Sequence, residues 1–268
     1  MTKKIIHLFK NDLRISDNPS FSAACENGDV IPIYILDEGN IYDDSAQGWW
    51  LINSLEKLNQ SLSNNLYMYS GNYKDVISNL VKKYDIQAVY WNRSYDPYSI
   101  NRDKDLKLYL ENKNIEVKTF NSTLLWEPWL VAKPDGTPYR VFSPFYRKGC
   151  LKQKEPRFPL PEPKKVSFFK LNDADDIKKL ELLNGFNWYD KLHEHWEIGE
   201  KAAQNKLSSF LNDGIDDYKD GRNFPAKNNV SRLSPHIRFG EISPNQIWYA
   251  ARAVREDRNV DHFCSELG

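Results

Sequence analysis

KIIHLFKNDLRISDN, residues 4–18, opens with an apolar run and continues into a polar loop. The run at residues 4–9 is short and bounded by polar residues, which is typical of a buried strand. Asn18 and Pro19 supply the N-cap and the first residue of a helix. A buried strand joined to a helix is the repeating unit of an α/β fold, so we expect this stretch to begin one.

The alternation of strand and helix continues to about residue 120. Further strands are predicted by apolar runs at residues 30–36, 66–69, 87–91 and 115–120. Helices are predicted between them by apolar stripes at residues 50–62 and 76–84 and by the segment 99–113. Strands that alternate with helices predict a parallel sheet covered on both faces. We therefore expect residues 1–130 to form a five-stranded, doubly wound, Rossmann-like α/β domain.

Sheets of this kind bind ligands beyond the carboxyl ends of their strands. The sequence carries no G-x-G-x-x-G or Walker motif after any strand, which argues against an ordinary dinucleotide or P-loop site. It has no G-x-S-x-G elbow, so a hydrolase triad is not supported. The five histidines lack zinc spacing, and no metal site is predicted.

The alternation of strands and helices ends after residue 120. Residues 131–170 hold ten Lys or Arg against three Asp or Glu, together with seven Pro. Such a stretch cannot be a continuous helix, and we predict an interdomain connector over residues 131–193. From residue 194 the pattern is helical, with one helix within 197–214 and another from Ser243-Pro244 to Val254. Residues 194–268 are therefore predicted to begin an all-helical domain.

Composition narrows the class of protein. The chain has 268 residues, 37 basic and 37 acidic, so any nucleic-acid contact must come from a local patch. Its 8 Trp, 15 Tyr and 13 Phe are dense enough for core packing or for stacking on rings and bases. Three distant cysteines indicate a reducing compartment. With no long apolar run at the N-terminus or elsewhere, we predict a cytoplasmic monomer without membrane contact.

Two segments have more than one interpretation. The loop at residues 9–18 holds two Asp, two Asn and an Arg, which suits either a polar ligand site or an Asp–Arg network that fixes the loop; the second is favoured. Residues 126–148 read WEPWLVAKPDGTPYRVFSPFYRK, with aromatic residues between cations. That pattern suits nucleic acid, although a segment that joins two domains can look the same.

The stretch 217–243 contains a candidate anion site. Ser231 and Ser234 flank Arg232 just before a run compatible with a helix. Hydroxyls and free backbone N–H groups near a helix start bind phosphate well. The alternative is that a serine only caps the helix, which is the commoner role of any isolated serine.

Five segments resemble class I DNA photolyases and cryptochromes, in order and at the spacing of that family. Residues 8–18 resemble W-F-R-x-D-L-R-x-x-D-N, and 91–97 resemble W-N-R-x-Y-x-P. Residues 141–145 resemble V-F-T-P-F, 196–200 resemble W-x-x-G-E, and 231–241 resemble the flavin segment S-x-L-S-P-x-L-x-x-G-x. The resemblance implies a bilobed protein, with an α/β antenna domain followed by a helical domain that holds a folded-over FAD.

The resemblance also assigns residues. Tyr218 matches a tyrosine that contacts FAD, Phe263 a position where an aromatic ring packs on the cofactor, and Val230, Ser231, Arg232, Leu233 and Ser234 the loop around the flavin phosphates. Val230 replaces the usual Thr, which removes one hydroxyl contact. Arg222 matches an arginine that contacts DNA. Glu266 matches the glutamate that hydrogen-bonds a flipped-out pyrimidine dimer.

The implied activity is light-driven repair of cyclobutane pyrimidine dimers in ultraviolet-damaged DNA, by electron transfer from excited reduced FAD. The alternative is a cryptochrome, a blue-light receptor without repair activity. A third possibility is an unrelated α/β nucleotide-binding module. The family motif continues past Gly268, so we expect the 268-residue chain to bind FAD poorly and to have no repair activity alone. A second, antenna chromophore is also implied; Tyr98-Ser99 stand where folate binders often have Asn-Glu, which leaves methenyltetrahydrofolate, a deazaflavin, another flavin or none.

Overall fold

The computed structural model describes residues 2–37, 42, 44–172, 180, 182–183 and 187–268. Its first part is a parallel sheet with the strand order β3-β2-β1-β4-β5. The strands are β1 (Lys4–Phe9), β2 (Asp29–Leu36), β3 (Tyr67–Ser70), β4 (Ala88–Asn92) and β5 (Glu116–Phe120). The helices between them are α1 (Pro19–Asn27), α2 (Ala46–Ser61), α3 (Tyr73–Tyr84) and α4 (Pro97–Glu111). The predicted five-stranded parallel sheet is confirmed.

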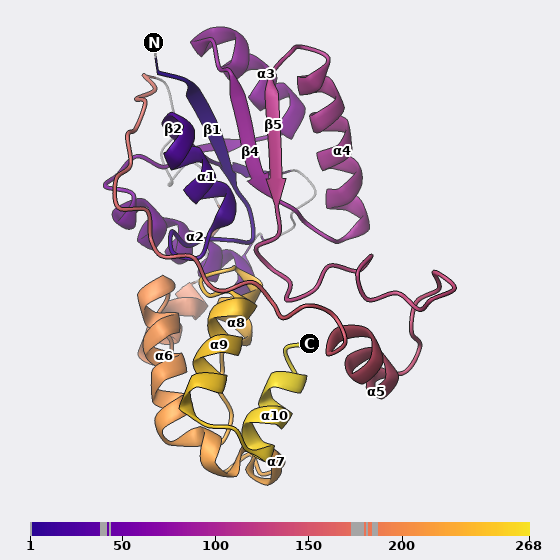
Figure 1. Cartoon of the computed structure of the whole chain (residues 1–268). Helices are drawn as coiled ribbons and strands as arrows, with labels where there is room; N and C mark the ends of the chain where they lie inside the picture. The colour runs from indigo at the N-terminus through magenta and orange to yellow at the C-terminus, as the bar shows by residue number, and fades with distance from the viewer. Residues whose placement is uncertain (1, 38–41, 43, 173–179, 181, 184–186) are drawn as a thin grey trace.

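Helices cover both faces of the sheet (Figure 1). Successive side chains of a strand point to opposite faces, so β1 contributes Ile5 and Phe9 to one core and Ile6 and Leu8 to the other. The first core is completed by α1 and α2, and the second by α3 and α4. Because both faces are covered, the strands β1, β2 and β4 are mostly apolar and buried, whereas the edge strand β5 (EVKTF) is only partly buried and carries Glu116 and Lys118.

The stretch after β5 returns along the α/β domain before it reaches the helices. It contains α5 (Phe142–Pro144), the π-helical turn η1 (Phe145–Cys150) and the 3-10 segment η3 (Asn187–Glu194). Phe168 forms a parallel bridge with Val30 at the start of β2. The backbone N–H of Asp17 donates to Leu160 O at 2.9 Å. This segment therefore contacts the sheet domain along its path, and Figure 1 shows it running down one side of that domain.

The last part of the chain is helical. Its elements are α6 (Glu200–Asn212), η4 (Gly214–Asp217), α7 (Tyr218–Gly221), α8 (Ser234–Arg238), α9 (Pro244–Val254) and α10 (Arg258–Ser265). The helix α9 has the bounds expected from the sequence, and Ser243 and Gln246 form a capping box at its start. An apolar cluster that includes Leu207, Phe210, Ile247 and Trp248 forms the core of this part. Among the described residues, no helix has the length and apolarity to cross a membrane.

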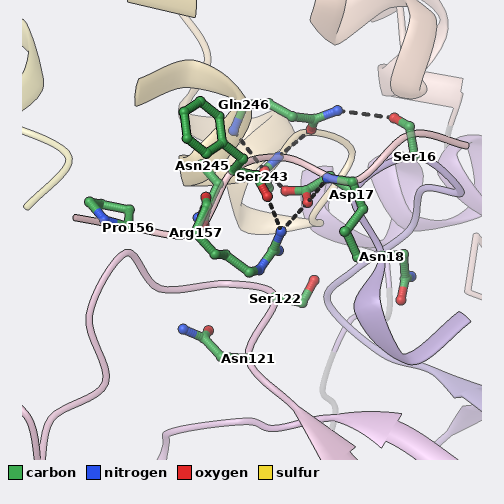
Figure 2. Close-up of polar contacts among 12 residues, drawn as sticks. Ser16, Asp17, Asn18, Asn121, Ser122, Pro156, Arg157, Ser243, Asn245 and Gln246 are labelled. Atoms are coloured by element: carbon green, nitrogen blue, oxygen red, sulfur yellow. Dashed lines mark hydrogen bonds and ion pairs between the residues drawn. The ribbon is translucent and has the colours of Figure 1, made fainter. Parts of the chain in front are cut away.

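A buried polar joint connects the α/β domain to the helices. Figure 2 shows the carboxylate of Asp17 between the side chains of Arg157 and Ser243, and both donate to it. Arg14 is 1% exposed and donates to the carbonyls of Asp17 at 2.7 Å, Ser122 at 2.9 Å and Gly240 at 2.9 Å. The loop after β1 is therefore hydrogen-bonded to the connector and to the helical part at once.

Gly240 is required at this joint by its backbone and its surroundings. Its φ is +68°, and a Cβ would lie 2.0 Å from the carbonyl oxygen of Asn11. The next residue, Glu241, is fully buried and accepts from Trp50 Nε1 at 3.2 Å, from the backbone N of Gly199 at 3.0 Å and from the hydroxyl of Ser54. The end of α8 is therefore fixed against α2.

Candidate functional site

An aromatic cluster at α7 and α10 contains two of the predicted flavin residues. The ring of Tyr218 lies 5.2 Å from that of Phe263 and 5.6 Å from that of Phe210, and Phe210 and Phe263 are 4.8 Å apart. Tyr218 and Phe263 are buried, and burial raises the pKa of the Tyr218 hydroxyl. The structure thus brings Tyr218 and Phe263 together in one buried group of rings, the aromatic wall.

The two residues predicted to contact DNA and the lesion also meet. Arg222 Nη1 lies 2.5 Å from Glu266 Oε1, and both side chains are partly exposed. The hydrogen bond to Glu266 raises the pKa of Arg222. The guanidinium also lies 5.3 Å from the centre of the Tyr218 ring. The ion pair therefore lies next to the Tyr218 ring of the aromatic wall.

His262 belongs to the same cluster, and sequence reasoning missed it. Its Nε2 lies 3.4 Å from Arg222 Nη1 and 3.9 Å from Glu266 Oε1, and its ring is 6.0 Å from that of Tyr218. The available signal was its i,i+4 spacing to Glu266 on a helix, which places both side chains on one face.

The loop at residues 230–234 presents polar groups to the surface. Arg232 has φ +51°, an uncommon left-handed conformation for a residue other than glycine. Val230, Arg232 and Ser234 are exposed, whereas Leu233 is buried in the same apolar cluster as Tyr218 and Phe263. The loop is therefore anchored by one apolar side chain, and its polar side chains face outward.

In the structure neither Ser231 nor Ser234 caps α8 with its side chain. The N-cap of α8 is Leu233, with no side-chain cap, and Ser234 is the first helical residue. Ser231 Oγ accepts from the backbone N of Leu233 at 3.4 Å. Within the described residues neither hydroxyl has an acceptor, so both O–H groups are available as donors. Because α8 has only five residues, any anion affinity rests on these donors and Arg232 rather than on a long helix dipole.

The loop after β1 is fixed by hydrogen bonds between its own residues and to neighbouring segments, in agreement with the favoured interpretation. Asn92 Nδ2 donates to Asp12 Oδ2 at 2.5 Å and to Asn18 Oδ1 at 2.7 Å. The cation of Arg14, however, is directed at carbonyl oxygens, and Asp17 pairs with Arg157. Lys10 is buried against Asp103, and burial lowers its pKa to about 8.

A small crevice remains beside this loop. Its volume is about 190 Å³, and it lies beyond the carboxyl ends of the neighbouring strands β1 and β4. Polar residues of both strand ends line it together with Arg238 of α8, including Lys10, Asn11, Asp12, Asn92, Arg93 and Tyr95. Ligands of open α/β sheets bind at this topological switch point.

The described residues contain no group of three or more His, Cys, Asp or Glu side chains placed to hold a metal ion. The candidate site therefore consists of an aromatic wall, an ion pair and a loop of hydroxyl donors, all in the helical part. That combination suits a ring system with attached phosphates and an anionic polymer beside it.

Comparison with known proteins gives the family. The sequence model of the DNA photolyase family matches residues 5–164, more than half of the chain. The chain therefore belongs to the DNA photolyase family. This membership excludes the unrelated nucleotide-binding module considered from the sequence.

Two curated relatives illustrate the range of that family. A deoxyribodipyrimidine photo-lyase of Agrobacterium fabrum is 36% identical over 99% of this chain and 57% of its own length. Cryptochrome-2 of Arabidopsis thaliana is 32% identical over 94% of this chain and 43% of its own length. The chain thus spans about half the length of these relatives.

Two solved structures share the fold. A bacterial class III photolyase from Agrobacterium tumefaciens superposes with a TM-score of 0.94 at 34% identity, covering 100% of this chain and 57% of that one. An archaeal photolyase from Sulfolobus tokodaii has a TM-score of 0.74 at 27% identity over 98% of this chain and 57% of its own. It is described with two FAD molecules, which imply a novel light-harvesting cofactor. Members of the family thus bind FAD and a light-harvesting cofactor.

Proposed function

We propose that this protein acts in light-driven repair of cyclobutane pyrimidine dimers in DNA. The observation that carries the proposal is the Arg222–Glu266 ion pair on the wall of Tyr218 and Phe263. An aromatic wall suits a flavin, and a partly exposed cation and carboxylate suit a phosphate and a base beside it. Similarity to photolyases over 95–99% of the chain supports the same activity.

The residues of the loop fit the diphosphate of FAD. Ser231 and Ser234 offer hydroxyl donors, and Arg232 is an exposed cation in the same turn. Tyr218 and Phe263 fix the wall beside which the ring system would lie. When bound in its reduced, excited form, FAD supplies the electron that splits the dimer.

The residues of this chain then hold the substrate. Arg222 provides a cation for a phosphate, which positions the strand without reading its sequence. Glu266 accepts hydrogen bonds from the edge of an extruded pyrimidine, as in enzymes that take a base out of the stack. Their mutual ion pair keeps both groups in place before DNA arrives.

The subclass proposed from the sequence was class I. The solved structure with a TM-score of 0.94 at 34% identity is described as class III. This similarity favours class III for the present chain, and we propose that assignment in place of class I.

We propose that the antenna chromophore binds at the crevice beyond the carboxyl ends of β1 and β4. The supporting observations are its place at the switch point and its polar lining from both the sheet and α8. Methenyltetrahydrofolate, a deazaflavin or another flavin would each enter it with only part of the molecule, because its volume of about 190 Å³ is below that of an ordinary ligand pocket. We propose in addition that residues 1–130 form the antenna domain, residues 131–193 the connector and the residues from 194 on the flavin domain.

A cryptochrome-type receptor without repair activity is the second candidate. The 32% identity with cryptochrome-2 of Arabidopsis thaliana favours it. A cryptochrome would use the same flavin loop, so substitutions in that loop do not distinguish the two candidates. Substitutions of Glu266 and Arg222, which would contact DNA, do distinguish them.

The test is repair of ultraviolet damage in a repair-deficient host by the protein expressed from its complete gene. We expect blue light to restore growth, and Glu266→Gln to lower the repair rate about 10–100-fold, since a charge-assisted hydrogen bond is lost. Glu256→Gln, an exposed residue of the same region, is the matched control. Flavin-loaded protein that gives no repair in light would favour the cryptochrome. The 268-residue chain alone is expected to retain less than stoichiometric FAD, because its phosphate loop is open to solvent.

A further inference from the structure

Glu241 is a fully buried carboxylate that joins α2, α8 and the start of α6. One of its oxygens, Oε1, accepts from Trp50 Nε1 at 3.2 Å, from the hydroxyl of Ser54 and from the backbone N of Gly199 at 3.0 Å. The other oxygen, Oε2, lies 2.5 Å from Nδ1 of His236. The first oxygen is therefore fixed by α2 and by the N-cap of α6, and the second oxygen holds α8.

The imidazole of His236 takes its orientation from Glu241. The side chain is fully buried, and Nδ1 carries the hydrogen of the bond because a carboxylate only accepts. Its Nε2 has no hydrogen-bond partner among the described residues. The ring also meets that of Trp50 edge to face, with the centres 5.1 Å apart. A hydrogen bond is more directional than such a ring contact, so Glu241 fixes the direction in which His236 points.

The helix α8 carries the loop at residues 230–234 at one end and His236 on its single turn. Ser234 is the first residue of α8 and precedes His236 by two residues, which is about 3 Å along the helix axis. The helix has five residues and no side-chain N-cap, so it has little stability of its own. Figure 1 shows α8 at the end of the helical part that faces α2. Any movement of His236 would therefore move Ser234 as well.

The loop before α8 needs support from its surroundings. Arg232 has φ +51°, and a left-handed conformation of this kind persists only when the neighbouring structure holds it. Leu233 anchors the loop in the apolar cluster of the helical part, but apolar packing is not directional. His236 supplies the directional contact on the other side of Ser234. The Ser234 hydroxyl is thus held between an apolar anchor and a polar one.

A carboxylate is a costly choice for a position that only has to be filled. Apolar residues of similar volume are often as stable as a buried ionic group, whereas a buried ionic group fixes one arrangement of its partners in some proteins. The four donors around Glu241 offset the cost of its desolvation and leave it a single orientation. The chemistry of the site is therefore that of a part that orients its neighbours.

We propose that Glu241 is a positioning residue for FAD. Through His236 it sets the place of the loop at residues 230–234, and thereby the affinity of the hydroxyls of Ser231 and Ser234 for the flavin diphosphate. Because Glu241 is fully buried in the joint, it acts without contact to the cofactor. This assignment rests on the proposed function, since it takes that loop as the phosphate site of FAD.

Titration of FAD into the apoprotein expressed from its complete gene, followed by flavin fluorescence in the dark, tests the assignment. Glu241→Gln keeps the size of the side chain but places an amide donor against Nδ1 of His236, and we expect the Kd for FAD to rise about tenfold. His236→Asn retains a donor near the position of Nδ1 and should stay within about threefold of the wild type, whereas His236→Leu should raise the Kd about tenfold. Glu197→Gln, at an exposed carboxylate before α6, is the matched control and should leave the Kd unchanged.

A double-mutant cycle separates positioning from a general loss of structure. When Glu241→Gln is added to the double variant Ser231→Ala with Ser234→Ala, we expect the Kd to change by less than about threefold, because the hydroxyls that Glu241 positions are already absent. The same tenfold loss in both backgrounds would overturn the assignment. Circular dichroism checks the folding of each variant. Should Glu241→Gln not fold, the two His236 variants decide, and equal Kd values for His236→Asn and His236→Leu would count against the assignment.

The outcomes also separate this assignment from the proposed function. A wild-type Kd in Glu241→Gln, together with a raised Kd in the Ser231/Ser234 variant, would overturn the positioning role alone. Unchanged affinity in the Ser231/Ser234 variant would refute the loop as the phosphate site, and the positioning role with it. Because only FAD binding is measured, the result does not depend on whether the protein repairs DNA.

Discussion

The burial of His7 makes the stability of the folded protein depend on pH. It lies in the middle of β1, fully buried, with Nδ1 3.1 Å from Ser20 Oγ and its ring 4.3 Å from that of Phe9. Burial is the largest influence on it and lowers its pKa from 6.5 to about 4. The folded protein therefore keeps this imidazole neutral at pH values where the unfolded chain would protonate it.

The expected consequence is acid sensitivity between pH 6.5 and about 4. Because the unfolded state binds the extra proton, the stability from neutral His7 is complete above pH 6.5 and is lost as the pH falls, by about 3 kcal/mol. Urea unfolding at pH 7 and at pH 4.5 measures this difference. His7→Phe should flatten the dependence over this window, and a variant as pH-sensitive as the wild type would contradict the assignment to His7.

At the scale of elements, short segments hold most of the candidate site. The loop at residues 230–234 is anchored through Leu233, while its hydroxyls and Arg232 remain free to bind. The short helices α7 and α10 carry the aromatic wall and the ion pair. Such elements have little stability of their own, and they are held by packing against α6 and α9.

Removing the hydroxyls of the loop should affect flavin binding and leave folding nearly unchanged. Ser231→Ala with Ser234→Ala is expected to raise the Kd for FAD about tenfold or more in the protein from its complete gene, since two hydrogen bonds to charged phosphates are lost. Ser208→Ala with Ser209→Ala on the exposed side of α6 is the matched control. Flavin titration followed by fluorescence measures both, and equal affinity in the two double variants would contradict the loop as the phosphate site.

At the scale of the whole molecule, the α/β domain and the helices share buried polar contacts. Arg14 reaches the carbonyl of Gly240, Ser243 donates to Asp17, and Glu241 accepts from Trp50. A buried donor or acceptor that loses its partner is costly, so neither part can separate without leaving several such groups unsatisfied. The joint also places α8 beside the crevice at the carboxyl end of the sheet.

We expect the two parts to unfold together. Far-ultraviolet circular dichroism and tryptophan fluorescence should give one coincident transition in urea. Arg14→Leu leaves three buried carbonyls without their donor and should cost about 3–5 kcal/mol. Arg140→Leu, at an exposed site, should change stability by less than about 0.5 kcal/mol. Separate transitions in the wild-type chain would show that the joint does not couple the parts.

The number and the parallel direction of the strands followed from the sequence, as did the start of α1 at Asn18-Pro19 and the bounds of α9 at Pro244–Val254. These features are local: periodicity, caps and prolines act within a few residues. Resemblance to a family also supplied Arg222 and Glu266 as separate candidates.

Only the tertiary structure decided which distant residues meet. It joined Arg222 to Glu266 and His262, directed Arg14 at carbonyls of three segments, and set the second half of the 126–148 segment against α9 and α10. A side chain's type and spacing determine what it can bind, whereas its partner depends on the path of the chain between them. That path is fixed by packing of the whole core, which no local pattern contains.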